Sequence, residues 1–123
     1  MLSILPQIIG IPTLVGQACL LFNDTLTDTQ LSNCTNIGSR SYAAFDRNIH
    51  DLGTLTGANL LDVASIGVDL GLLTMNTSLI SDAYDRVHNE VTVQSAVMAD
   101  GIRLDGSFGQ HQGLIYNGNY GKD

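Results

Sequence analysis

The stretch that decides the fold is residues 58–91, ANLLDVASIGVDLGLLTM followed by NTSLISDAYDRVHNEV. Apolar side chains in its first half recur at spacings of three or four residues, at Leu61, Ala64, Val68 and Leu72. This period predicts a helix over residues 59–75. From the second half onward, the corresponding apolar stripe consists of Ile80, Ala83, Tyr84, Val87, Val91 and Met98. It predicts a second helix that Thr77 or Ser78 caps and Gly101 ends.

Two glycines lie inside the first of these helices. Gly67 and Gly71 each cost about 1 kcal/mol relative to alanine in a helix interior. Because they are separated by about one turn, they share one face of the helix. Their missing side chains predict that another helix approaches closely on that face.

Weaker helical signals precede this pair of helices. Pro12 can occupy the first turn of a helix whose apolar run ends at Asn23, and we expect most of that run to be buried. Thr27 is an N-cap candidate for a helix that Gly38 closes. Residues 39–57 are polar and less regular, and they predict a long connection with one helical turn. Helical pairs without an alternating strand pattern indicate an all-α architecture in a single domain.

The composition narrows the functional classes. Hydrophobic residues make up 44% of the chain and charged residues only 14%, as is typical of a folded protein. The net charge is −7 and the few basic residues do not cluster, so we expect no nucleic acid partner. No uninterrupted run of about 18 apolar residues occurs, so we expect no membrane span.

Cysteines and glycosylation sequons bear on the compartment. Cys19 and Cys34 can bridge neighbouring helices in an oxidising compartment or remain buried thiols, and their spacing, which matches no metal or redox motif, favours the thiols. Three N-x-[ST] sequons, which begin at Asn23, Asn33 and Asn76, point modestly to secretion. The apolar N-terminus is not interpreted as a signal peptide, because basic residues are lacking and prolines interrupt it.

Residues 105–123, DGSFGQHQGLIYNGNYGKD, are rich in glycine and lose the helical period, which predicts a turn and then a loop or short extended segments. Asp105, Ser107 and His111 supply the residue types of a hydrolase triad. They are too close together in sequence, however, and no G-x-S-x-G elbow occurs. The histidines of the chain lack the spacing of zinc ligands, and no glycine motif for phosphate follows a strand. We therefore expect no metal and no cofactor.

Three short motifs follow one another along the chain: TGAN at Thr56–Asn59, DGS leading to a histidine at residues 105–111, and YNGNYG at residues 116–121. Together they resemble the catalytic segment of family-8 polysaccharide lyases, the hyaluronate, chondroitin and xanthan lyases. The segment Ile9–Pro12 is similar to the one that follows this family's paired tryptophans. The resemblance covers nearly the whole chain. It implies helical hairpins of an incomplete (α/α) toroid that ends in a glycine-rich catalytic loop.

The resemblance also implies a reaction, β-elimination at a uronic acid of an acidic polysaccharide. A base removes the C5 proton, the bond to O4 breaks, and a C4=C5 double bond forms. It implies that the Asn59 amide neutralises the uronate carboxylate by hydrogen bonding at a helix start, without adding a competing charge. It assigns proton transfer to Tyr120 and a partnering role to His111, in proton abstraction or in neutralising the carboxylate. Tyr116 and Asn117 are implied substrate contacts.

The chain also departs from the family. It contains no tryptophan, and the arginine that assists the tyrosine in the family has no counterpart, since Lys122 is not at an equivalent position. We therefore interpret residues 1–123 as a partial catalytic domain of a secreted lyase, with weak or no activity alone. The alternatives are a non-catalytic protein that binds acidic glycans and a fragment that does not fold stably. Apolar helix faces without their toroid neighbours predict self-association.

Overall fold

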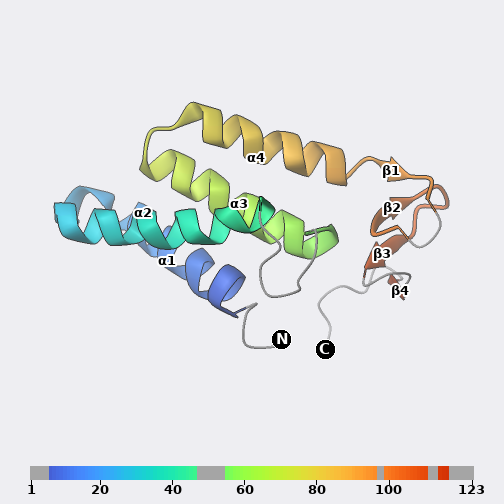
Figure 1. Cartoon of the computed structure of the whole chain (residues 1–123), viewed down its shortest axis with the longest axis horizontal. Helices are drawn as coiled ribbons and strands as arrows, with labels where there is room; N and C mark the ends of the chain where they lie inside the picture. Colours follow the sequence, from blue (N-terminus) through green and yellow to red (C-terminus); the bar gives the residue numbers. More distant parts are fainter. Residues whose placement is uncertain (1–5, 47–54, 97–98, 111–113, 117–123) are drawn as a thin grey trace.

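A computed structural model of the chain describes residues 6–46, 55–96, 99–110 and 114–116. Two helical hairpins are followed by a small sheet (Figure 1). The first hairpin joins α1 (Ile11–Leu21) to α2 (Asp28–Tyr42), and the second joins α3 (Gly57–Leu73) to α4 (Thr77–Glu90). The expected all-α fold of helical hairpins is therefore confirmed. Within the described ranges, no helix is both long and apolar enough to cross a membrane.

Short irregular turns flank the first hairpin. A π-helical turn (Pro6–Gly10) leads into α1, and 3-10 turns (Asn23–Thr25 and Ala43–Phe45) follow α1 and α2. The sheet contains β1 (Val93–Gln94), β2 (Gly101–Arg103), β3 (Phe108–Gln110) and β4 (Leu114–Tyr116), in that order. Strand β2 pairs in parallel with β1, and the other two pairings are antiparallel. Short extended segments were expected only within residues 105–123, where β3 and β4 lie. Strand β1 lies where a helix was expected, and neither β2 nor the assembly of the strands into one sheet was expected.

The start of α2 agrees with the sequence prediction, but its end does not. The Thr27 side chain accepts a hydrogen bond from Gln30 N at 3.2 Å, and the Gln30 side chain accepts one from Thr27 N at 2.9 Å. This reciprocal capping box satisfies two backbone donors that the helix leaves unpaired. Helix α2 then continues past Gly38 to Tyr42. A Cβ at Gly38 would lie 3.2 Å from Leu70 Cδ1, so this glycine allows α3 to approach and does not end the helix.

The limits of α4 also differ from those expected. Its N-cap is Asn76, whose side chain accepts a hydrogen bond from Leu79 N at 3.1 Å, and neither Thr77 nor Ser78 takes that role. The helix ends at Glu90, well before Gly101. Gly101 has a φ of 101° and begins β2, so it marks the start of a strand. The left-handed conformation at this position favours glycine.

Helix α3 is the centre of the bundle, because it packs against α1, α2 and α4. Its buried residues are Gly57, Val63, Ala64, Ile66, Gly67, Leu70, Gly71 and Leu73. The predicted stripe was only partly right, since Leu61 and Leu72 are 37% and 50% exposed. A helix with three neighbours is apolar on most sides, so the spacing of its apolar residues does not identify the exposed face.

The two glycines of α3 provide the expected close contact, but to two different helices. A Cβ at Gly67 would lie 2.2 Å from Cε2 of Tyr42 on α2, and one at Gly71 would lie 2.5 Å from Cγ1 of Ile80 on α4. Both distances are below van der Waals contact. Helices α2 and α4 therefore pack against α3 more closely than alanine at positions 67 and 71 would allow.

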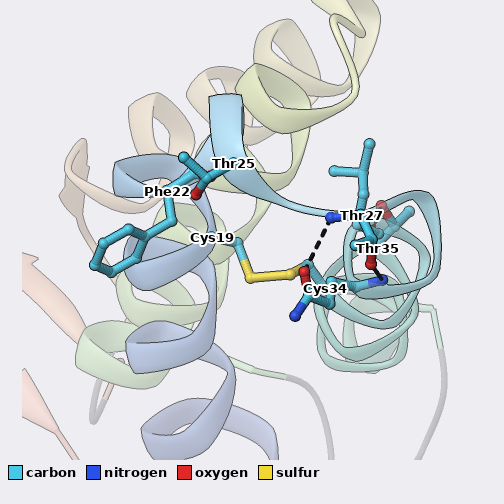
Figure 2. The surroundings of a disulfide bond; sticks show 8 residues. Cys19, Phe22, Thr25, Thr27, Cys34 and Thr35 are labelled. Carbon is cyan, nitrogen blue, oxygen red and sulfur yellow. Dashed lines mark hydrogen bonds between the residues drawn. A yellow bond between two sulfur atoms is a disulfide. The ribbon is translucent and has the colours of Figure 1, made fainter.

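A disulfide joins the helices of the first hairpin. Cys19 on α1 and Cys34 on α2 have Cα atoms 6.3 Å apart and form a covalent bond (Figure 2). Both half-cystines are buried and pack with Leu73 of α3. The expectation of free thiols was wrong. The antiparallel hairpin brings the two cysteines to facing positions, which their separation in sequence does not reveal.

Several large apolar side chains are exposed on α1 and its C-cap, contrary to expectation. Leu14, Leu21 and Phe22 are 70%, 82% and 60% exposed, whereas Cys19 on the same helix is buried. Helix α1 packs against α2 and α3 on one side only, so its other side has no partner within the described residues. Self-association through this apolar side stays a prediction.

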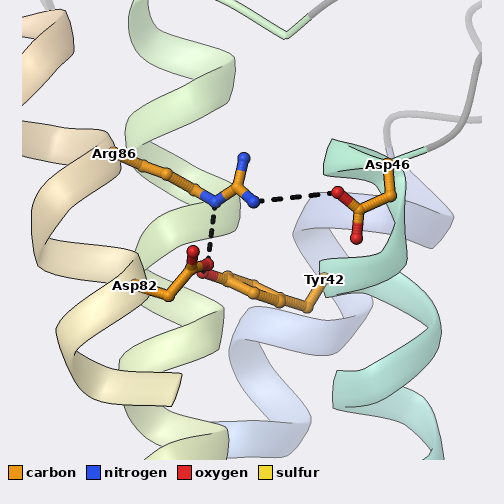
Figure 3. Close-up of polar contacts among 4 residues, drawn as sticks. All are labelled: Tyr42, Asp46, Asp82 and Arg86. Carbon is orange, nitrogen blue, oxygen red and sulfur yellow. Dashed lines mark hydrogen bonds and ion pairs between the residues drawn. The ribbon is translucent and has the colours of Figure 1, made fainter. Parts of the chain in front are cut away.

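A polar cluster links α2 to α4 on the outside of the bundle (Figure 3). The Tyr42 hydroxyl donates to Asp82, and Arg86 Nε donates to the same carboxylate at 2.8 Å. The Arg86 guanidinium lies 4.3 Å from the centroid of the Phe45 ring and 3.7 Å from Asp46 Oδ1. Burial and the hydrogen bond to Asp82 raise the pKa of Tyr42 well above its usual value, while bonds from Arg86 and Tyr42 lower that of Asp82. Because these groups are bonded to one another, we assign the cluster a structural role.

Reduction of the disulfide should destabilise the chain. The cystine closes a loop with a sequence separation of 15, and a link of this size stabilises the fold by about 3 kcal/mol. We expect reductant to lower the Tm of the wild-type chain, as measured by circular dichroism. The Tm of a Cys19→Ser/Cys34→Ser variant should be similarly low and should not change when reductant is added. An unaltered Tm after both thiols become titratable would contradict this expectation.

The Tyr42 contact should make stability depend on alkaline pH. The pKa of Tyr42 is raised in the folded state, so the contribution of this side chain to the free energy of unfolding is complete below about pH 10. That contribution is lost as the pH rises further, because the Tyr42 hydroxyl then ionises in the unfolded chain but not in the folded one. Tyr42→Phe should lower the free energy of unfolding by about 1 kcal/mol at neutral pH. The free energy of unfolding of this variant, measured with denaturant, should then decline less steeply at alkaline pH than that of the wild type. Tyr84→Phe, at an exposed position on α4, is the matched control. Equal alkaline slopes for wild type and Tyr42→Phe would refute the assignment.

Candidate functional site

The TGAN motif begins a helix, as the resemblance implied. Thr56 is the N-cap of α3, with extended backbone, and Gly57 is the first helical residue with a φ of 59°. Asn59 therefore lies at the third helical position, where its side chain is half-buried. The Thr56 side chain makes no capping bond to α3. Asn59 is inside the first turn and is not the N-cap, so its amide is not needed for that role.

Two acidic side chains from later in the chain hold the start of α3. The Glu90 carboxylate, at the last residue of α4, accepts a hydrogen bond from the Gly57 backbone N–H. The Thr56 hydroxyl donates to Asp100 Oδ2 at 2.7 Å. Sequence analysis did not find either contact, because the partners are separated by 33 and 44 residues and belong to no motif.

The expected Asp-Gly-Ser turn connects β2 to β3. Asp105 Oδ1 accepts hydrogen bonds from Ser107 N at 3.0 Å and from Ser107 Oγ at 2.6 Å. Gly106 has a φ of 82°, which favours glycine at this position of the turn. The two bonds from Ser107 lower the pKa of Asp105. Asp105 and Ser107 thus shape the hairpin that leads to the histidine.

Strand β3 brings the expected catalytic segment toward α3. It packs against α3, and His111 directly follows its last residue, Gln110. Strand β4 pairs with β3 so that Tyr116 lies opposite Phe108. Asn59 and the strand that directly precedes His111 in the sequence are therefore on neighbouring elements.

Three of the five predicted site residues fall outside the residues that the structure describes. They are His111, Asn117 and Tyr120. Tyr116 is described as the last residue of β4, and Asn59 as part of α3. A shared cleft for Asn59, His111 and Tyr120 stays a prediction.

Arg103 supplies positive charge within the sheet. Its Nη2 donates to Ala99 O at 3.3 Å, and its Nε is buried without a hydrogen-bond partner in the described part of the chain. A Cβ at Gly109 would lie 3.0 Å from both of these nitrogens, so the glycine makes room for the guanidinium on β3. A cation is therefore packed against the strand that leads to His111.

Acidic groups surround the start of α3. Asp62 lies one turn beyond Asn59, and burial raises its pKa. Glu90 and Asp100 contact the two residues at the beginning of the helix. The positive end of the helix dipole therefore faces the Glu90 carboxylate of the protein itself. Among the described residues, no group of three or more histidine, cysteine or carboxylate side chains could hold a metal.

Comparison with known proteins places this arrangement in a family. Residues 7–123 match the polysaccharide lyase family 8, N-terminal alpha-helical domain. The chondroitin AC lyase of Streptomyces coelicolor A3, solved in complex with chondroitin sulphate, is similar with a TM-score of 0.78 and 26% identity, over 95% of this chain and 15% of that chain. A mutant of that enzyme gives a TM-score of 0.73 and 24% identity, over 91% of this chain.

The chain spans only 15% of the length of these lyases. The matching part includes both helical hairpins and the strands after them, so the all-α fold inferred from the sequence agrees with the N-terminal alpha-helical domain of this family. Because the match extends over nearly all of its residues, the chain belongs to polysaccharide lyase family 8.

Proposed function

We propose that the chain contributes the carboxylate-neutralising and proton-transfer groups of a lyase that cleaves an acidic polysaccharide by β-elimination. One observation carries this proposal: the helix start that bears Asn59 is linked by side-chain hydrogen bonds to the end of α4 and to the segment that begins the sheet, whose strand β3 directly precedes His111 in the sequence. Asn59, His111 and Tyr120 keep the roles that the family resemblance implies. Tyr116 and Asn117 are proposed substrate contacts.

The chemistry favours an amide at position 59. The C5 proton of a uronate is weakly acidic while the adjacent carboxylate is charged, because the developing carbanion places negative charge beside it. An amide donates hydrogen bonds to that carboxylate without adding a charge. Since Glu90 already occupies the Gly57 N–H, that donor does not serve the substrate, and the proposal assigns neutralisation to the Asn59 side chain.

The proposed substrate class is a uronate-containing glycosaminoglycan. Chondroitin sulphate is bound in the structure of the similar Streptomyces lyase. The −7 net charge of this chain opposes a polyanion, so positive groups near the reacting sugar are needed. Arg103 is one such group, packed beside the strand before His111.

Activity should depend on Asn59 and Tyr120. When the chain is incubated with chondroitin or hyaluronan, we expect a slow rise in the ultraviolet absorbance of the unsaturated uronate, in keeping with the weak activity expected of the chain alone. Asn59→Ala should lower this rate by about 100-fold or more, as expected for loss of a preorganised donor to developing charge. Tyr120→Phe, which lacks the phenolic proton, should be at least as severe. Asn36→Ala, at an exposed position on α2, is the control. Turnover that is indifferent to both site variants would refute these roles.

Binding without turnover is the competing outcome of the same experiment. If the absorbance stays flat, calorimetry with chondroitin and hyaluronan tetrasaccharides separates a glycan-binding protein from a chain with no glycan function. If the chain binds a glycan and Asn59→Ala weakens that binding, the result supports a substrate-binding site that has lost its catalytic activity. No binding to either glycan would contradict the proposed function.

We also propose that the protein is secreted. The Cys19–Cys34 disulfide fits an oxidising compartment, and the asparagines of all three sequons, Asn23, Asn33 and Asn76, are exposed. Asn23 and Asn76 both lie in connections between helices, where a bulky glycan can be accommodated.

Mass spectrometry of the producing cells should therefore find this protein outside the cell. We expect the extracellular fraction to contain the disulfide-linked peptides with Cys19 and Cys34, and Asn23 to be converted to aspartate after enzymatic glycan removal. Cytoplasmic recovery with both cysteines reduced would contradict secretion. If the extracellular protein is disulfide-linked but carries no glycan, the proposal of secretion stands and the proposal that the sequons are glycosylated is wrong.

A further inference from the structure

We infer that Glu90 is a positioning residue, which holds the first turn of α3 so that the Asn59 amide faces the substrate carboxylate. The inference rests on the proposed lyase function and adds to it a residue that lies in none of the three motifs. Glu90 acts through the backbone of Gly57 and has no part in the chemistry itself.

The contact connects two ends of the second hairpin. Glu90 is the last residue of α4, Gly57 is the first residue of α3, and Figure 1 shows these helix ends on the side of the hairpin that faces the strands. The Glu90 side chain is half-buried and accepts the Gly57 N–H, one of the backbone donors that the first turn of a helix leaves unpaired. A carboxylate at this end is also favoured by the helix dipole.

Strand β2 confines Glu90 from the other side. A Cβ at Gly101 would lie 3.1 Å from Glu90 O and 3.6 Å from Glu90 Oε1, so the glycine lets the start of β2 lie over this residue. Directly before it, Asp100 accepts the Thr56 hydroxyl at 2.7 Å. The start of α3 is therefore held at two successive residues, by α4 and by the segment that begins the sheet.

This arrangement fixes Asn59 because only one residue separates it from Gly57. Gly57 has a left-handed φ of 59°, a conformation that glycine adopts freely and that tertiary contacts must select. If the N–H of Gly57 were released, the first turn could fray and the Asn59 amide would move with it. A displacement of about 1 Å at a catalytic group is enough to lower a rate by about 100-fold.

The test uses the full chain, four variants outside the motifs, and Asn59→Ala as the reference for loss of the site. Glu90→Ala removes the acceptor, whereas Glu90→Gln keeps an oxygen that can accept the Gly57 N–H. Glu90→Asp keeps the charge but retracts it by one methylene, and it serves if the alanine variant does not fold. Asp85→Ala removes an exposed acid from the same helix and is the matched charge control. The rate of amide hydrogen exchange at Gly57, measured by NMR, shows whether its hydrogen bond to Glu90 is intact. Titration with a chondroitin tetrasaccharide measures the affinity of the proposed site.

We expect exchange at Gly57 to accelerate at least about tenfold in Glu90→Ala, for loss of a hydrogen bond to a charged acceptor, with α1 and α2 unaffected. Tetrasaccharide affinity should fall by the same factor as in Asn59→Ala, and Glu90→Gln and Asp85→Ala should resemble wild type. Unchanged Gly57 exchange in Glu90→Ala and Glu90→Asp would overturn the inference.

Two further outcomes separate the inference from the function on which it rests. If exchange accelerates and Asn59→Ala weakens binding while Glu90→Ala does not, Glu90 is only a structural cap and the inference is wrong. If wild type binds no tetrasaccharide and shows no turnover, the proposed function fails, and the positioning role fails with it even though the exchange result stands.

Discussion

The packing of α3 against three other helices is the constraint on which the rest of the structure depends. Apolar residues on most of its sides are buried, and glycines at 67 and 71 let Tyr42 and Ile80 approach more closely than alanine would allow. A helix held in this way has little freedom to shift along its axis. Its first turn, which bears Asn59, is therefore placed by the core of the bundle, and only its local conformation depends on contacts at its end.

The electrostatics at the start of α3 are unusual for a site that is proposed to receive a polyanion. The Gly57 N–H is paired with Glu90, Thr56 is bonded to Asp100, and Asp62 lies one turn further along the helix. A protein that used the helix dipole itself to bind a uronate would leave these donors open. Here the acidic groups fix the backbone. Under the proposed function, neutralisation of the substrate therefore falls to the neutral amide of Asn59 and to cations on other segments. Arg103 shows that the sheet can hold such a cation beside the strand that precedes His111.

The sequence predicted the parts of the fold that depend on local order and missed those that depend on distant partners. The helices around residues 59–75 and from Thr77 onward follow from their apolar spacing, and the Thr27 cap and the Asp105–Ser107 turn follow from short-range hydrogen bonds. Gly38 was misread as a helix end because its packing against Leu70 of α3 is not visible in sequence. The Cys19–Cys34 bond and the Glu90–Gly57 contact were missed for the same reason.

The candidate site illustrates the same division between local and distant information. The TGAN motif identified Asn59 as the start of a helix, yet the residues that select the conformation of that start come from the end of α4 and the beginning of β2. The chain spans 15% of the length of the similar lyases. Contacts within this chain position the first turn of α3, which bears Asn59, relative to the strand that precedes His111, since α3 contacts β3 directly. The alignment of those two elements is thus a property of the described part of this chain.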